Sequence, residues 1–216
     1  MKRIIVFWHN YLVNDWKKIV TEQFGKLVSS DLYGVCEAVK NGVVCNSQDE
    51  ANEHQVLMVD LAKEHQVDPG KLQATYVFEN NYEYCTLKML QDFAQSNDAY
   101  VLYFHTKGVS CPPSYKRFKA KKEHKRRHME EVNILGWSGC VEKLDEGYLC
   151  CGTNKKWKFY SGNFWWANTD YIKTLPNLDK LSPGHGNYSY YEKWLLWSKR
   201  GTWSMPRPRI YCYPWG

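Results

Sequence analysis

The sequence predicts an α/β fold, a single domain with an open and mostly parallel central sheet flanked by helices. Short apolar segments alternate with amphipathic ones over the first 105 residues, and this alternation is typical of parallel sheets covered on both faces. The 216 residues suffice for one large domain of this kind. A disordered chain is excluded, because the sequence is 44% hydrophobic and holds 10 Trp, 16 Tyr and 8 Phe.

Hydrophobic periodicity and turn signals predict the elements of the first half. Strands are expected at residues 4–8, 33–39, 74–79 and 100–105, and helices at 15–27, 50–65 and 86–96. Asn14 is a candidate cap for the first helix, and Asn41-Gly42 is expected to form a turn. Ligands of open parallel sheets bind at the carboxyl ends of the strands, so the loops at 9–10, 79–80 and 105–108 are the expected binding region.

The second half of the chain is less regular. Helices are expected at 130–144, from Thr169 or Asp170 to before Pro176, and at 188–198, with a strand at 148–152. Residues 205–216 contain three prolines and are expected to be an extended tail, or a linker to a further domain, after a domain at 1–204.

The net charge of +6 is concentrated in one segment. Eight of the twelve residues at 116–127 are Lys or Arg. Such a run can hold a polyphosphate or a nucleic acid, and a solvated helix face is the alternative.

No feature marks the chain for a membrane or for secretion. No apolar run approaches the ~18–20 residues that span a bilayer, and the N-terminus lacks the long apolar region of a signal peptide. We therefore expect a soluble cytoplasmic protein whose eight cysteines, which include no CxxC pair, are reduced thiols.

Three stretches concentrate polar chemistry. In the first, an apolar strand ends abruptly in His105-Thr-Lys-Gly108. Lys107 offers a point charge for phosphate, and His105 is a candidate metal ligand, phosphate donor or proton carrier. A capped turn with a hydrogen-bonded histidine is the alternative.

The other two stretches lie in the second half. In residues 160–167 (YSGNFWWA), Trp165 and Trp166 are candidate platforms for sugar rings and Asn163 a partner for hydroxyls; a buried core strand is the alternative. In residues 184–197, Gly-flanked His185 and helical Glu192 are candidate catalytic residues. Glu192 is either a general base or the partner of a cation.

Taken together, these motifs resemble a known family. Glu83, followed by His105-Thr-Lys-Gly108, by Gly162-Asn-Phe-Trp-Trp-Ala167 and by Tyr171-Ile-Lys-Thr-Leu175, resembles small nucleotide-sugar glycosyltransferases of the GT-A fold, such as those encoded by large DNA viruses of chlorella-like algae. The resemblance covers about residues 1–200. It implies a nucleotide-binding half at about 1–110 and an acceptor half at about 111–204, in an enzyme that moves a hexose from a UDP-sugar to a glycan or glycoprotein acceptor. For a viral enzyme this is synthesis of a viral or surface glycan in the host cytoplasm.

The sequence departs from this family at the metal site. GT-A enzymes usually hold a divalent cation, here expected to be Mn²⁺, with an Asp-x-Asp motif. This chain contains no such motif, and its position falls on residues 105–107. Either other ligands hold the metal, drawn from His105, Asp98, Glu79 and His185, or cationic side chains replace part of its role.

Roles for the site residues follow from this interpretation. The base and ribose are expected against Trp8, His9, Asn10 and Tyr11, with Glu37 or Glu79 on the ribose hydroxyls. The diphosphate is expected on Lys107, Arg126 and Arg127. The sugar and acceptor are expected against Asn163, Trp165, Trp166 and His185. Glu192 is the candidate base of an inverting enzyme, and a retaining enzyme would use a different arrangement around the anomeric carbon. Two alternatives remain at this stage: a nucleic-acid-binding module that uses residues 116–127, and a non-catalytic glycan-binding module.

Overall fold

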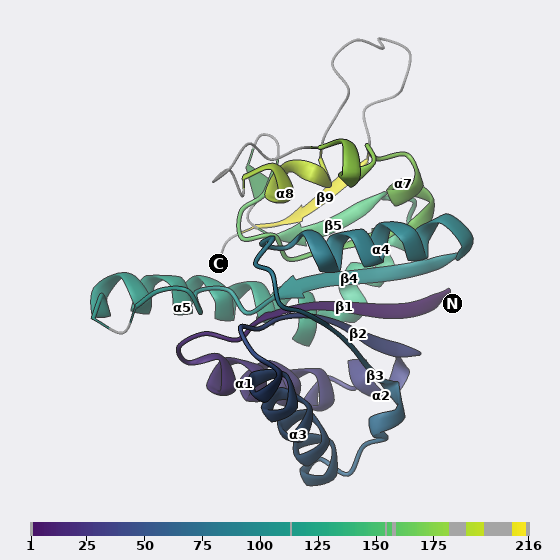
Figure 1. The fold of residues 1–216 in the computed structure, drawn as a ribbon. Coiled ribbons are helices and arrows are strands. Elements are labelled where there is room, and N and C mark those ends of the chain that lie inside the picture. Colours follow the sequence, from purple (N-terminus) through teal and green to yellow (C-terminus); the bar gives the residue numbers. More distant parts are fainter. Residues whose placement is uncertain are drawn as a thin grey trace.

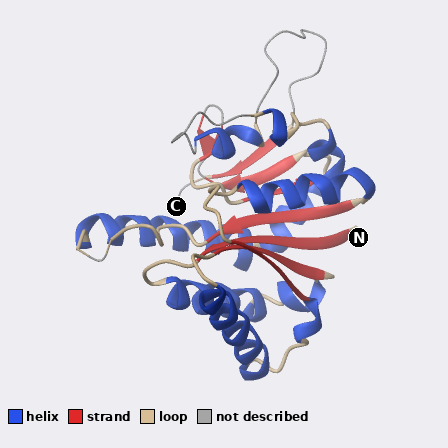
Figure 2. Ribbon diagram, in the orientation of Figure 1, coloured by secondary structure: helices blue, strands red, loops and turns tan. Residues whose placement is uncertain are grey.

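A seven-stranded sheet forms the centre of the computed structural model, which describes residues 2–112, 114–153, 155–156, 159–181, 189–196 and 209–214 (Figures 1 and 2). In spatial order the strands are β3 (Leu72–Val77), β2 (Ala38–Val44), β1 (Arg3–Tyr11), β4 (Ala99–His105), β8 (Trp165–Asn168), β5 (Cys150–Thr153) and β9 (Ile210–Tyr213). The first four are mutually parallel, and only β8 runs against its neighbours. The mostly parallel central sheet predicted from the sequence is confirmed.

Helices cover both faces of this sheet, and β1 shows why. Ile4, Val6 and Trp8 of β1 enter one apolar core with α1 (Trp16–Ser29), α3 (Gln48–Glu64) and α6 (Trp137–Asp145). The alternate residues Ile5 and Phe7 enter a second core with α4 (Tyr84–Ser96), α7 (Thr169–Lys173) and α8 (Ser189–Trp194). A strand buried on both faces needs such a continuous apolar run.

The segment at 33–44 differs from its prediction. Residues Leu32–Val35 form a short helix, α2, and the strand begins at Ala38, so Asn41-Gly42 lies inside β2 rather than in a turn. Helix α4 packs on β2 at this point: a Cβ on Gly42 would lie 1.9 Å from Thr86 Oγ1. Gly42 therefore permits a close helix–strand approach.

The remaining elements are a long helix at the carboxyl ends of the parallel strands, a π-helical segment and several short pieces. Helix α5 (Lys116–Glu130) contains the basic run and projects beyond this edge of the sheet (Figure 1). The helix predicted at 130–144 is interrupted, because a π-helical segment (Glu131–Leu135) joins α5 to α6. The short pieces are η1 (Pro69–Lys71), η3 (Leu178–Lys180) and the β6–β7 pair (Lys155–Lys156 and Phe159–Tyr160).

Two further expectations are corrected. Residues Ile210–Tyr213 are extended, as predicted for the tail, but they pair in parallel with β5 and belong to the sheet rather than to a linker. Asn14 does not cap α1, which has Asp15 at its N-cap; Asn14 instead donates from its amide to the Val109 carbonyl at 2.8 Å. Among the described helices, none combines the length and apolarity that a bilayer crossing demands.

Candidate functional site

Polar side chains converge where β4 ends. His105 is the last residue of β4, and Glu83 immediately precedes α4. The Glu83 carboxylate accepts hydrogen bonds from Tyr103 Oη, at 2.8 Å, and from the amide of Asn163, and its other oxygen lies 3.8 Å from His105 Nε2. Three segments that are distant in the sequence thus meet around one carboxylate.

The turn before β8 closes this arrangement. Gly162 (φ 106°) and Asn163 (φ 57°) both have left-handed backbones, and the Gly162 carbonyl accepts a hydrogen bond from His105 Nε2 at 2.8 Å. The φ of Gly162 favours glycine, because other residues rarely adopt it, and a Cβ there would also lie 2.4 Å from Met129 Sδ. Trp165 Nε1 donates to Asn163 Oδ1 at 2.8 Å and orients its amide toward Glu83.

Two lysines face the same turn. Lys107 Nζ lies 3.8 Å from Glu192 Oε1 on α8, and the two side chains are each 19% exposed. Lys125 on α5 donates from Nζ to Ser161 Oγ at 2.5 Å. We call the set formed by Glu83, His105, Lys107, Lys125, Asn163 and Glu192 the strand-end site.

Burial shifts the protonation equilibria of this site. Desolvation, with a smaller contribution from the charge of the neighbouring Lys107, lowers the pKa of Lys125 to about 8. Desolvation raises the pKa of Glu192 despite the opposing charge of Lys107, and Glu83 adds to the increase. His105 is buried and its pKa falls to about 3, so its imidazole is neutral and donates from Nε2 at neutral pH.

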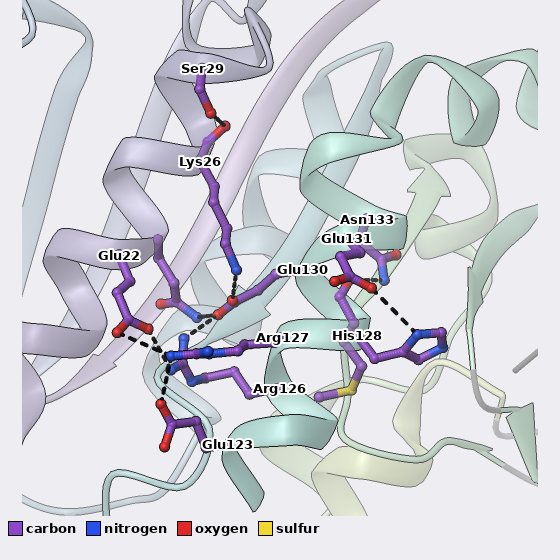
Figure 3. A network of polar contacts seen from close by, with 12 residues as sticks. Glu22, Lys26, Ser29, Glu123, Arg126, Arg127, His128, Glu130, Glu131 and Asn133 are labelled. Carbon is purple, nitrogen blue, oxygen red and sulfur yellow. Dashed lines mark hydrogen bonds and ion pairs between the residues drawn. The ribbon is translucent and has the colours of Figure 1, made fainter. Parts of the chain in front are cut away.

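A buried ion-pair network holds α5 in place behind the site (Figure 3). The Arg126 guanidinium lies 2.7 Å from both Glu22 on α1 and Glu130, and Lys26 Nζ lies 2.5 Å from Glu130. Gln23 donates to Glu130 Oε1 at 2.8 Å and to the His105 carbonyl at 3.1 Å. The network therefore links α1, α5 and the end of β4.

Because of this network, the prediction that Arg126 binds the diphosphate is wrong. Arg126 is 1% exposed and engaged by two carboxylates. Arg127 has an exposed side chain and pairs with Glu123 at 2.8 Å (Figure 3). Of the three predicted cations, only Lys107 lies at the site. Lys125, which immediately precedes Arg126, was not singled out, since the uniformly basic run does not show which lysine faces inward.

The predicted nucleotide-binding residues of β1 are mostly interior. Trp8 is fully buried and donates to Gln23 Oε1 at 2.9 Å. His9 Nδ1 lies 2.9 Å from Thr86 Oγ1, and Asn10 donates to Asn41 Oδ1 at 3.2 Å. Tyr11 is half-buried at the end of the strand. Trp8 is a core residue, and His9 and Asn10 form the floor beneath the carboxyl edge.

Two predicted residues lie at the wrong end of the sheet. Asp98 precedes β4 and pairs with Lys2 at 2.6 Å, while Glu37 precedes β2 and pairs with Arg3 at 2.5 Å. A seven-residue strand is about 20 Å long, so Asp98 cannot share a metal ion with His105. Glu79, by contrast, is exposed in the loop after β3 at the correct edge.

Trp165 and Trp166 are also core residues. The Trp165 ring stacks on Tyr103 with 5.1 Å between centroids, and Trp166 Nε1 donates to the Asn133 carbonyl at 2.9 Å. Both are buried and cannot serve as open platforms for a sugar. His185 lies outside the described residues.

The described side chains do not fit a divalent cation. Within the described ranges, no group of three or more His, Cys, Asp or Glu side chains is arranged to hold a metal ion. His105 Nε2 is bonded to a carbonyl, Glu83 accepts from two donors, and Glu192 faces a lysine. Ammonium groups next to such a site repel a second cation.

The sequence of the chain matches a known family. The model of the family described as "Domain of unknown function (DUF8361)" matches residues 6–201, a range that includes the whole strand-end site. The chain belongs to the DUF8361 family. No curated protein matches this DUF8361 chain. Among solved structures it is similar to 4-diphosphocytidyl-2C-methyl-D-erythritol synthase from Anaerococcus prevotii DSM 20548, with 8% identity and a TM-score of 0.48 over 99% of this chain and 87% of that one.

Proposed function

We propose that this DUF8361 protein is a glycosyltransferase that moves a hexose from a UDP-sugar to a hydroxyl of a glycan acceptor at the strand-end site. The observation that supports this most is the division of charge within the site. Lys107 and Lys125 provide cations, and Glu83 and Glu192 provide carboxylates, at the carboxyl edge of a parallel sheet. A sugar diphosphate has the matching division: a charged diphosphate beside a ring of neutral hydroxyls.

Each half of the site suits one part of this ligand. Ammonium groups that are partly removed from water bind phosphate oxygens strongly, and carboxylates accept hydrogen bonds from sugar hydroxyls. The Asn163 amide, fixed between Glu83 and Trp165, lies beside the carboxylates. Because these groups are fixed before the ligand arrives, little ordering is required on binding.

The proposed reaction uses Glu192 as the general base. The Glu192 carboxylate takes the proton of the acceptor hydroxyl, the acceptor oxygen forms a bond to the anomeric carbon, and the bond between that carbon and the diphosphate oxygen breaks. The products are the glycoside and UDP, whose developing charge is stabilised by Lys107 and Lys125. The raised pKa of Glu192 brings it toward the range in which general bases are effective.

A thermal-shift panel tests the donor class. The protein is heated with UDP, GDP, CMP or ADP, each with and without Mn²⁺, and uridine serves as the control without a diphosphate. We expect UDP to raise Tm in proportion to the logarithm of its concentration, because it binds the native state only. No shift with any nucleotide, or a larger shift with the purine nucleotides, would contradict the proposal.

A second candidate function rests on the exposed start of α5. Tyr115 and Phe118 are 64% and 57% exposed beside Lys116, Arg117 and Lys121, and this combination suits stacking and phosphate contacts with single-stranded nucleic acid. Titration with an oligonucleotide at increasing salt distinguishes the two functions. Steep loss of binding with salt, unaffected by UDP, would favour the nucleic-acid function.

A further inference from the structure

We infer that Lys107 and Lys125 together hold the diphosphate of the donor, in place of a divalent cation. This inference rests on the proposed function and specifies how that site meets the charge of the leaving group.

Both lysines lie against the turn at 161–163. A Cβ on Gly162 would lie 3.2 Å from Lys107 Cε, so the Gly162 backbone lies against the Lys107 stem. Lys125 Nζ is bonded to Ser161 in the same turn. Two ammonium groups at one turn supply the same total charge as a divalent ion.

Contacts within the fold position the segments that carry both lysines. Lys107 lies in the tight turn after β4, where its backbone N–H donates to the His105 carbonyl at 2.7 Å. Lys125 directly precedes Arg126, and the buried ion pairs of Arg126 with Glu22 and Glu130 fix this turn of α5 against α1. A diphosphate arriving between the lysines therefore meets cations that are already in place.

The acidic groups of the site are unsuited to a metal. Glu83 accepts hydrogen bonds from Tyr103 and Asn163, and Glu192 is paired with Lys107. The carboxylate predicted to complete a metal site, Asp98, lies at the opposite end of β4. The Asp-x-Asp position of the resembled family is occupied here by His105-Thr106-Lys107.

Protonation of Lys125 provides an independent signature. Burial is the largest cause that lowers its pKa to about 8; the charges of Lys107, Lys156 and Lys121 act in the same direction, and the Glu192 carboxylate opposes them. A bound diphosphate favours the protonated form. Affinity for UDP should therefore fall about tenfold from pH 7 to pH 9, because a group of pKa 8 is about nine-tenths deprotonated at pH 9.

Calorimetric titration with UDP in EDTA and in Mn²⁺ tests the inference. We expect equal affinities in the two buffers. Lys125→Met should weaken UDP binding ten- to a hundredfold and leave uridine binding unchanged. The control is Lys63→Met, which replaces an exposed lysine of α3 outside both candidate binding surfaces and should bind UDP like the wild type. The pH profile is measured on the wild type and so does not depend on the folding of any variant.

The outcomes distinguish a failure of this inference from a failure of the proposed function. UDP binding that requires Mn²⁺ overturns the inference and leaves the proposed function standing. Absence of nucleoside diphosphate binding in both buffers overturns both. A flat affinity between pH 7 and pH 9, or wild-type affinity in a folded Lys125→Met variant, removes Lys125 from the diphosphate site.

Discussion

Lys107 Nζ lies 3.8 Å from Glu192 Oε1, and this ion pair joins the end of β4 to α8. Both side chains are 19% exposed, so the pair is partly removed from water and its charges act on each other strongly. In the proposed reaction, a diphosphate that binds Lys107 replaces Glu192 as the counter-ion of the Lys107 ammonium group. Glu192 then loses its counter-ion and becomes a better proton acceptor, so donor binding prepares the base.

The contribution of Lys107 can be measured directly. Lys107→Ala removes a charge-assisted hydrogen bond and should weaken binding of UDP by about 1–3 kcal/mol. Uridine, which carries no phosphate, should bind as to the wild type. Calorimetric titration of both ligands checks this, and unchanged UDP affinity in a folded variant would make Lys107 a structural partner of Glu192 only.

Glu192→Gln separates catalysis from binding. Glutamine keeps the shape and most hydrogen bonds of the side chain but cannot accept a proton, so turnover should fall by about two to four orders of magnitude. Donor affinity should stay near that of the wild type, since the lysines are retained. Steady-state rates and donor titration together check this; near-normal sugar transfer by the variant would reject the base.

Arg126 and Arg127 form a matched pair for testing the buried network. Arg126→Met removes one of the two cations that pair with the fully buried Glu130, and Lys26 remains as the other; we expect a loss of up to about 3–5 kcal/mol in the free energy of unfolding. Arg127→Met removes an exposed pair and should change stability by less than about 1 kcal/mol. Urea unfolding of the two variants measures the difference. Equal effects would show that Arg126 is not the anchor of α5.

Buried histidines predict how stability depends on pH. Burial lowers the pKa of His54 to about 4, below its unfolded value near 6.5, so the native state disfavours its protonation. The associated stability is complete above pH 6.5 and is lost as pH falls from 6.5 toward 4. At pH 5.5 this histidine alone costs about 1.4 kcal/mol.

Urea unfolding of the wild type and of His54→Gln at pH 7 and pH 5.5 tests this dependence. The wild type should lose more stability than the variant between the two values. Identical losses would assign the pH dependence to other groups, among them His9, whose pKa burial also lowers to about 4.

The sequence predicted the sheet better than it predicted the site. Apolar runs such as residues 100–105 identify buried strands, because backbone pairing and burial on both faces leave little choice of residue. The turn predicted at Asn41-Gly42 was wrong, because glycine serves both in turns and where a helix packs closely on a strand. The strand at Ile210–Tyr213 was also not predicted, since the prolines around it suggest a linker and its partner β5 is distant in the sequence.

The residues of the candidate site that the sequence predicted are mainly those at or near the end of a strand. His105 and Lys107 lie where the abrupt end of β4 places them, and Glu192 and Asn163 lie beside them. Asp98 and Glu37 were predicted at the site but lie at the opposite edge of the sheet, because residue composition does not distinguish the two ends of a strand. Lys125 and Arg126 are adjacent in a uniformly basic run, and only the packing of α5 on α1 decides which of them is buried in ion pairs.

A crystal structure of the protein with bound UDP-glucose tests the central claim most directly. The account predicts diphosphate oxygens within hydrogen-bond distance of Lys107 Nζ and Lys125 Nζ, and hexose hydroxyls on the carboxylate side of the site, near Glu83 and Glu192. A nucleotide sugar bound elsewhere, for example on the exposed start of α5 around Tyr115, or one whose diphosphate points away from both lysines, would contradict it.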